Sequence, residues 1–245
     1  MTVTEAGGRM LRHAARATAA MRAAEADLNA LAEGDAGTLR VATFQSVGVR
    51  VIPRVMRLYV TRWPAIEVKL VEADQGRLIE LLVRGESDLA FVADSAETAI
   101  EQVEVLTDPY VLLAPAGSEL AQRKKTVSSR EIARLPLIAY RLSSEGGEAH
   151  LLSKGIEPRI VFRSDDSGIV QGLVGAGVGY ALVPRLTVDR ADPDVATLDV
   201  RGIPPREIGL AWHADRRLSP AATAFVEVVE EVAAGLRARE PAWHR

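Results

Sequence analysis

Two hydrophobic periodicities divide the chain into a helical N-terminal part and a longer part of alternating strands and helices. In the first part, apolar residues recur at alternating spacings of four and three, at Met10, Ala14, Ala17, Met21, Ala24, Leu28 and Leu31. Such spacing is typical of the a and d positions of a coiled coil. It predicts a helix from about Glu5 to Ala32 that pairs with a second copy. The alternative is an amphipathic helix packed on its own domain.

Beyond residue 36, short apolar runs alternate with helical periodicity. The predicted strands are Thr38–Thr43, Glu67–Val71 and Leu89–Val92, and the helices between them are Val47–Arg62 and Gly76–Arg84. Pro53 is compatible with the first helix only in an early turn or at a kink. This alternation predicts a parallel sheet with right-handed crossovers.

A second α/β lobe of similar size follows. Its predicted strands are Tyr110–Ala114, Leu137–Tyr140, Arg159–Phe162 and Gly179–Val183, and its helices are Glu145–Lys154, Ser167–Ala176 and a short one opened by the capping box Ser128–Glu131. A last strand, Ile208–Trp212, and a helix capped by Ser219 are expected to return to the first lobe. The chain would then cross between the lobes near Leu113–Ala116 and near Arg206–Gly209.

Composition excludes several classes of protein. The 245 residues carry a net charge of −3 and no cysteine, so disulfides, Cys-based zinc sites and a Cys nucleophile are excluded, and a basic nucleic-acid-binding surface is not expected. No apolar run is long enough to span a membrane. Arginines interrupt every N-terminal stretch that could serve in a signal peptide.

The sequence offers no catalytic or metal-binding pattern. None of its four histidines has a partner at metal-ligand spacing, and neither HExxH nor GxSxG occurs. The glycines of Gly175–Gly179 follow a predicted helix and precede a strand, the reverse of a phosphate-binding loop, so they are expected to end the helix and allow close packing. Asp165 and Asp166 are interpreted as helix caps. We therefore predict no catalytic residue, metal or cofactor.

Polar residues at two strand exits are the best candidates for a binding site. Ligands of two-lobed α/β proteins bind in the cleft, at the carboxyl ends of parallel strands. Thr43, Gln45 and Ser46 follow the first strand, where free amides would favour an anionic ligand, although Ser46 could be a simple N-cap. In the second lobe, Tyr140 is followed by Arg141, Ser143 and Ser144. Arg141 favours a small organic anion, whereas Asp165 and Asp166 argue mildly against one.

Several segments, in their order and spacing, resemble one known family. These are Thr4–Gly7 followed by Met10-Leu11, Gly37–Ala42 running on to Ile52-Pro53, Arg84–Ala90 (RGESDLA), Asp108–Ala116 with Leu120, Leu135–Ile138, Gly175–Gly179 with Val183-Pro184, and Ser219–Ala221 with Phe225. The chain resembles the regulatory part of LysR-type transcriptional regulators. The resemblance implies two Rossmann-like lobes joined by a two-stranded hinge, the type 2 periplasmic binding protein fold, preceded by a long linker helix. Four regions are then expected: residues 1–36 (end of the wing and dimerisation helix), 37–115 (lobe I), 116–206 (lobe II) and 207–245 (return strand and helix).

The resemblance also implies a cytoplasmic protein that is a dimer or tetramer and binds a small-molecule effector. The implied effector contacts are Thr43, Gln45, Ser46, Val47, Arg141, Ser143, Ser144, Asp165, Asp166 and Ser167. The family's helix-turn-helix should precede Thr4 and is not in this sequence, so operator DNA would be bound only through that absent region. Three rivals stay open: a solute-binding protein of the same fold, an enzyme on the same two lobes, and a truncated regulator that acts through mixed oligomers.

Overall fold

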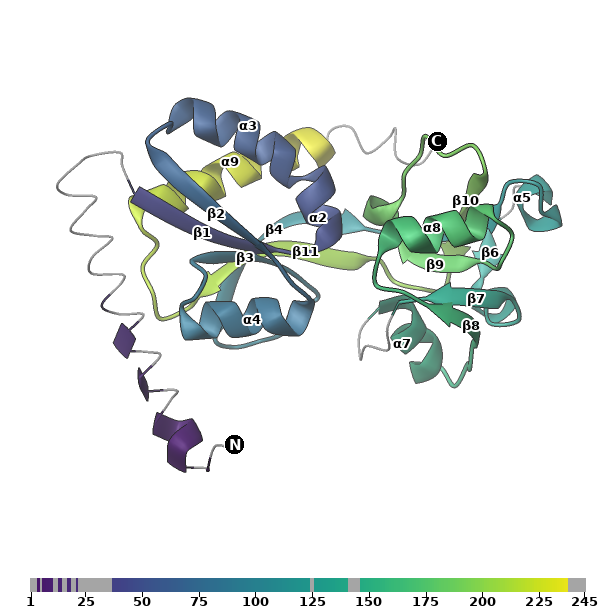
Figure 1. Cartoon of the computed structure of the whole chain (residues 1–245), viewed down its shortest axis with the longest axis horizontal. Coiled ribbons are helices and arrows are strands. Elements are labelled where there is room, and N and C mark those ends of the chain that lie inside the picture. The colour runs from purple at the N-terminus through teal and green to yellow at the C-terminus, as the bar shows by residue number, and fades with distance from the viewer. Residues whose placement is uncertain are drawn as a thin grey trace. The chain divides into compact units, whose positions relative to one another are not determined.

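The computed structural model describes residues 4, 6–10, 13–14, 17–18 and 21, and then residues 37–123, 126–140 and 146–237. Residues 6–10, 13–14, 17–18 and 21 are helical. The chain divides into two compact units (Figure 1). Unit 1 comprises residues 1–106 and 207–245, and unit 2 comprises residues 107–206.

Unit 1 is built on a five-stranded sheet with the order β2-β1-β3-β11-β4. The strands are β1 (Gly37–Thr43), β2 (Ile66–Glu72), β3 (Leu89–Ala93), β4 (Ile100–Asp108) and β11 (Arg206–His213). Strands β2 and β3 run parallel to β1, whereas β11 runs antiparallel to β3. The returning strand β11 thus joins the sheet of the first lobe, as the sequence predicted.

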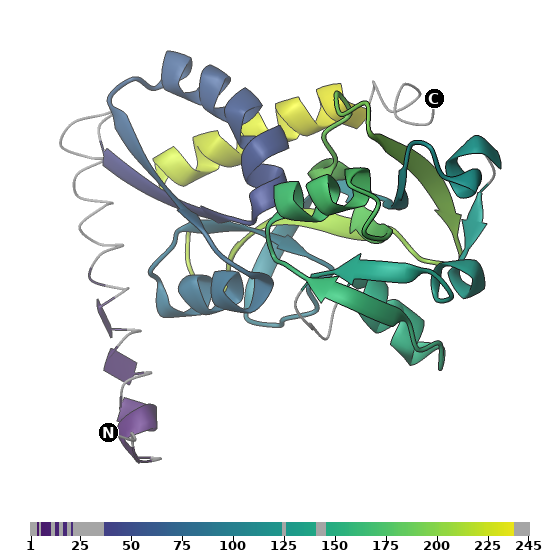
Figure 2. The same ribbon diagram turned by 45° about the vertical axis from the view of Figure 1, so that its right-hand side comes forward.

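Helices cover both faces of the unit 1 sheet. They are α2 (Gln45–Arg50), α3 (Ile52–Arg62), α4 (Gln75–Arg84) and α9 (Pro220–Arg237). Helices α3 and α9 lie side by side on one face and α4 lies on the other (Figures 1 and 2). Phe225 of α9 is fully buried, with its ring centroid 5.1 Å from that of Tyr59 on α3. The Tyr59 hydroxyl donates to the carbonyl of Ala221, which fixes α9 against α3.

Unit 2 contains two small sheets. A four-stranded sheet has the order β6-β10-β5-β9, and a second sheet consists of β7 and β8. The strands are β5 (Tyr110–Pro115), β6 (Val127–Ser128), β7 (Pro136–Ala139), β8 (Arg159–Arg163), β9 (Ala181–Pro184) and β10 (Val195–Arg201), and the helices are α5 (Glu119–Arg123), α6 (Ser129–Ile132), α7 (Gly146–Ser153), α8 (Ser167–Gly175) and the 3-10 turn η1 (Arg185–Thr187). A bridge between Leu137 and Tyr180 connects the two sheets.

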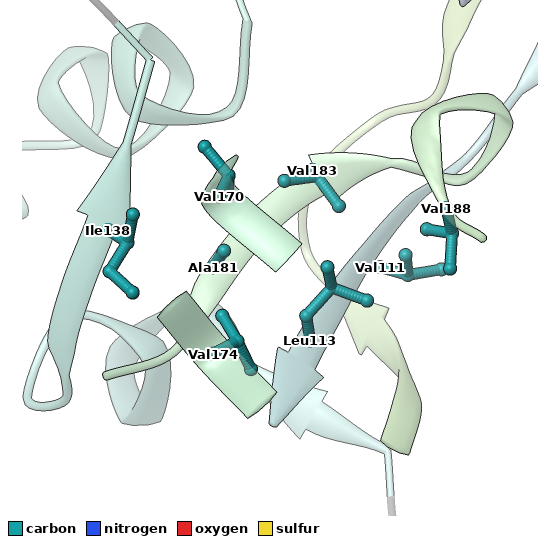
Figure 3. Close-up of a cluster of buried hydrophobic side chains, with 8 residues drawn as sticks. All are labelled: Val111, Leu113, Ile138, Val170, Val174, Ala181, Val183 and Val188. Atoms are coloured by element: carbon teal, nitrogen blue, oxygen red, sulfur yellow. The ribbon is translucent and has the colours of Figure 1, made fainter. Parts of the chain in front are cut away.

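Strand β5 separates two hydrophobic clusters in unit 2, because successive side chains of a strand point to opposite faces. Val111 and Leu113 face the cluster that α8 covers, where Val170 and Val174 pack against β5 and β9 (Figure 3). Leu112 and Ala114 face the other cluster, which includes residues of α5, α6 and α7. Unit 2 is therefore covered by helices on both faces.

The local signals for helix ends are confirmed. Ser128 and Glu131 form the capping box of α6, and the Ser219 hydroxyl accepts from the Ala222 amide at the start of α9. Helix α8 ends at Gly175, and Gly177 has a positive φ of 77°. At Gly179 a Cβ atom would lie 2.5 Å from the Pro136 carbonyl oxygen, so this glycine permits the close approach of β7.

Two predictions about the elements were wrong. The segment predicted as one helix, Val47–Arg62, is two helices that meet at Val51, because Pro53 has no amide to donate and lies in the first turn of α3. The first crossing lies near residues 106–107 rather than at Leu113–Ala116, because β5 pairs with β9 and β10 inside unit 2. Strands β4 and β10 were not predicted.

Within the described residues, no helix has both the length and the apolar character needed to cross a membrane.

Candidate functional site

The exit of β1, meaning its carboxyl end, lies at a topological switch point in the sheet of unit 1. The chain passes from β1 to β2 on one side, and then to β3 on the other side of β1. In open α/β sheets, such a switch between neighbouring parallel strands leaves a crevice at their carboxyl ends, where ligands bind. The sequence Thr43–Val47 begins at this position because β1 ends at Thr43.

The polar side chains at this exit are buried. Thr43 and Ser46 are 3% and 4% exposed, and the Thr43 hydroxyl donates to the Phe44 carbonyl at 3.3 Å. The N-cap of α2 is Phe44, which makes no side-chain capping bond, so the interpretation of Ser46 as the N-cap was wrong. Gln45 opens α2, and Val47 belongs to the core. The amides of a first helical turn have no acceptor within their own helix.

The neighbouring exit, that of β3, is fixed by two polar side chains that sequence reasoning missed. The amide group of Gln75 bonds both the N–H and the C=O of Ala93, at 3.0 and 2.6 Å. Asp94 follows with φ of 48°, and its carboxylate accepts from the Glu207 amide at 2.7 Å. Aspartate tolerates left-handed backbone better than most residues. The signal available in the sequence was the placement of Asp94 directly after an apolar strand.

In unit 2, the parallel strands β7 and β8 end at a common edge. Their carboxyl ends are linked by a bond from the Ser164 amide to the Ala139 carbonyl at 3.0 Å. Asp166 caps α8 by accepting from the Ile169 amide at 2.8 Å, which confirms the capping interpretation. Ser167 is the first residue of α8, next to Asp165 and Asp166. The other predicted contacts in this unit, Arg141, Ser143 and Ser144, lie outside the described residues.

A buried ion pair joins Asp108 to Arg206 in unit 2. Arg206 donates from Nε and Nη2 to Oδ2 of Asp108, at 2.9 and 2.7 Å, and Oδ1 of Asp108 accepts from the Leu186 amide at 3.0 Å. The side chains of Asp108 and Arg206 are 1% and 13% exposed. Burial raises the pKa of Asp108, and Arg206 and the Leu186 amide oppose that rise. Sequence reasoning missed this pair because its members are 98 residues apart.

Tyr140 directly follows β7 in the chain. Its ring packs against the cluster drawn in Figure 3. Burial raises the pKa of its phenol, a hydrogen bond with the Thr187 side chain and the charge of Arg206 lower it, and the carboxylates of Asp108 and Asp166 raise it further.

The predicted residues at the two exits offer hydrogen-bond donors and acceptors of the kind that line sites for small polar molecules. In unit 1 these residues supply hydroxyls and first-turn amides. In unit 2 the described ones supply the Ser167 hydroxyl and the carboxylates of Asp165 and Asp166, of which Asp166 caps α8. In the part of the chain that the structure describes, no group of three His, Cys, Asp or Glu residues could hold a metal ion.

The amino-acid sequence matches one family model over most of its length. The LysR substrate binding domain matches residues 32–234. A similar protein, the probable HTH-type transcriptional regulator LrrA of Synechococcus elongatus, is 25% identical over 202 residues. That alignment covers 82% of this chain and 69% of LrrA.

Solved structures share the fold. The effector-binding domain of QuiR, in complex with shikimate, has a TM-score of 0.72 at 18% identity, over 82% of this chain and 98% of that one. Full-length CbnR, in complex with its target DNA, has a TM-score of 0.68 at 23% identity, over 95% of this chain and 84% of that one. The fold is therefore the mixed α/β fold of LysR effector-binding domains, as the sequence predicted.

Proposed function

The chain belongs to the LysR-type transcriptional regulators, and from that premise we propose that the carboxyl-end exits of β1 and of β7–β8 bind its effector. The observation that carries this proposal is the burial of two hydroxyl-bearing side chains, Thr43 and Ser46, at the switch point of the unit 1 sheet. An apolar residue at such a buried position would favour stability, because a buried hydroxyl destabilises the fold unless it keeps a hydrogen bond. The Thr43 hydroxyl keeps such a bond within the chain, to the Phe44 carbonyl, so what supports the proposal is the polar character of this strand exit.

The proposed contacts are those that the sequence suggested. In unit 1 they are Thr43, Gln45, Ser46 and Val47, and in unit 2 they are Arg141, Ser143, Ser144, Asp165, Asp166 and Ser167. The effector class we propose is a small organic anion, because the first-turn amides of α2 and the Arg141 guanidinium favour negative charge. Shikimate, which is bound to the similar QuiR domain, belongs to this class.

Ligand binding tests the proposal directly. We expect thermal-shift screening of small acids, amines and neutral metabolites, shikimate included, to find acids that stabilise the chain. For an acid found in this way, Ser46→Ala should weaken binding by about tenfold in calorimetry, because a hydrogen bond to a charged group is lost. Thr61→Ala is the matched control, since the Thr61 hydroxyl bonds the Arg57 carbonyl on the exposed side of α3. Stabilisation by cations alone would overturn the choice of an anion.

Self-association through the N-terminal helix is a second part of the proposal. Met10 and Met21 are 73% and 69% exposed, and Ala14 and Ala17 are exposed as well, so the described positions of the heptad seam are not covered by the same chain. The remaining seam residues, Ala24, Leu28 and Leu31, lie outside the described residues. A second helix could bury this seam in a dimer, or in a tetramer built from dimers.

A charge on the seam should weaken assembly. We expect Met21→Glu to raise the dimer dissociation constant by at least about tenfold in sedimentation experiments, because the carboxylate would be buried between two helices. Arg9→Glu introduces the same side chain off the seam and should have a smaller effect. Equal masses for the Met21→Glu variant and the unmodified chain at all concentrations would show that this helix does not hold the assembly together.

The remaining elements of the proposal concern the full-length protein. We propose that operator DNA is bound through a helix-turn-helix outside residues 37–237, because LrrA is an HTH-type regulator and full-length CbnR binds its target DNA. A regulator acting on DNA would work in the cytoplasm without catalysis.

A further inference from the structure

The chain crosses between the two units twice, and the return crossing lies between two consecutive residues. Unit 2 ends at Arg206, and unit 1 resumes at Glu207. Both residues belong to β11, which is a hydrogen-bonded neighbour of β4, the strand that ends at the first crossing. Hinges are commonly a few residues at the ends of such elements, where a small number of backbone torsions absorb the movement.

On the unit 2 side of the return crossing, Arg206 is held by its side chain. Its guanidinium donates twice to Oδ2 of Asp108, the last residue of β4, at 2.9 and 2.7 Å. Oδ1 of Asp108 accepts from the Leu186 amide in η1 at 3.0 Å. This buried pair therefore ties the ends of the two crossing strands to each other and to the body of unit 2.

On the unit 1 side, Glu207 is held by its backbone. The Asp94 carboxylate accepts from the Glu207 amide at 2.7 Å, and the Asp94 amide donates to the Glu207 carbonyl at 2.9 Å. Asp94 directly follows β3, whose last residue, Ala93, has both backbone groups bonded by the side chain of Gln75. Glu207 is therefore tied to the carboxyl end of β3, whereas the residue before it is tied to unit 2.

Asp94 adopts a strained backbone conformation to make these two bonds. It is the one non-glycine residue with a positive φ, 48°, in the described part of the chain. Strain of this kind persists only where the surrounding structure requires it, and it is frequent at switch regions. We propose that Asp94 is a positioning residue that holds the return crossing, so that movement between the units is confined to the bonds that join Arg206 to Glu207 (the pivot).

The contacts of Asp94 also connect the pivot to the strand ends of unit 1. The Ala73 amide, which follows β2, donates to the Thr43 carbonyl at the end of β1, at 3.0 Å. Gln75, two residues later, holds the end of β3 next to Asp94. The carboxyl ends of β1, β2 and β3 thus form one bonded framework with the pivot. The inference goes beyond the proposed function, because this framework is present without a ligand.

Hydrogen exchange of the Glu207 amide, followed by NMR in the ligand-free chain, tests the role of Asp94. Asp94→Gly fits a positive φ but removes the acceptor, so this amide should exchange about three- to tenfold faster. Asp94→Asn tolerates the same φ and keeps a side-chain oxygen, so it should retain most of the protection. Asp189→Gly is the matched control, since the Asp189 carboxylate accepts from the Ala191 amide within unit 2.

Distances between two spin labels measure the movement itself. The chain contains no cysteine, so Thr61→Cys on α3 and Ser153→Cys on α7 provide one labelling site in each unit. The distribution of label distances should be broader in Asp94→Gly than in the chain with native Asp94, and Asp94→Asn should restore the narrower distribution. Glycine fits the turn at least as well as asparagine, so a role in the turn alone would give equal widths.

Two results would overturn the inference. One is an unchanged Glu207 exchange rate together with unchanged label distances in Asp94→Gly. The other is equal loosening in Asp94→Gly and Asp94→Asn, because the bond to the Glu207 amide would then not be what holds the pivot. Neither measurement uses a ligand, so failure of the proposed effector binding would leave the role of Asp94 standing, and the reverse also holds.

Discussion

Replacing Asp108 with alanine is expected to destabilise unit 2 by about 3–5 kcal/mol, the range for removing one partner of a buried ion pair. The Asp108 carboxylate is 1% exposed and accepts two bonds from Arg206 and one from the Leu186 amide. Alanine would leave a guanidinium and an amide buried without this acceptor. The loss should be larger than for an exposed pair such as Arg62–Glu231, whose side chains are 43% and 51% exposed.

Hydrogen exchange followed by mass spectrometry measures this effect where it arises. Amides of β5 and β9 in the Asp108→Ala variant should exchange faster, whereas those of β1 and β3 in unit 1 should be less affected. The double variant Asp108→Leu/Arg206→Met removes both charges and should recover part of the loss. Protection unchanged from the unmodified chain would show that Arg206 reaches solvent when its partner is removed.

Replacing Phe225 with alanine is expected to destabilise unit 1 by about 3–5 kcal/mol, as for other fully buried phenylalanines. Phe225 is 0% exposed and meets Tyr59 edge to face, with an interplanar angle of 67°. The variant would leave a cavity between α9 and α3 and would remove the contact that orients Tyr59, whose hydroxyl bonds the Ala221 carbonyl.

Urea unfolding followed by tryptophan fluorescence monitors this loss, because Trp63 lies 5.2 Å from Tyr59, centroid to centroid. We expect an earlier unfolding transition for Phe225→Ala. Phe162→Ala is the control, since Phe162 is 45% exposed on β8 in unit 2 and should shift that transition little. Similar shifts in both variants would contradict the assignment of Phe225 to the core of unit 1.

The apolar runs in the sequence predicted the central strands well. Leu89–Val92 is an uninterrupted apolar run and forms most of strand β3. All four of these residues are buried, as expected of a central strand covered on both faces. Strand β4 was missed because Glu101, Gln102 and Glu104 break its apolar pattern at the edge of the sheet. Strand β10 was missed for a similar reason, since Thr197 and Asp199 face solvent.

The candidate site was predictable only as far as it is local. Thr43–Val47 and Asp165–Ser167 were found because polar residues directly follow strands, and the Asp166 cap is a bond between near neighbours. The Asp108–Arg206 pair and the approach of Thr187 to Tyr140 depend on segments brought together by the tertiary fold. No periodicity in the sequence encodes such contacts.

The insertion of β11 between β3 and β4 has a consequence for biosynthesis. Unit 2 is a single continuous stretch of chain, so it can fold as soon as it leaves the ribosome. Unit 1 cannot, because β4 reaches the sheet only through β11, which is made much later. Until translation passes α9, the nascent β1–β3 sheet exposes both an unpaired strand edge and the apolar face that α9 will cover, which makes this interval the one in which a chaperone is most needed.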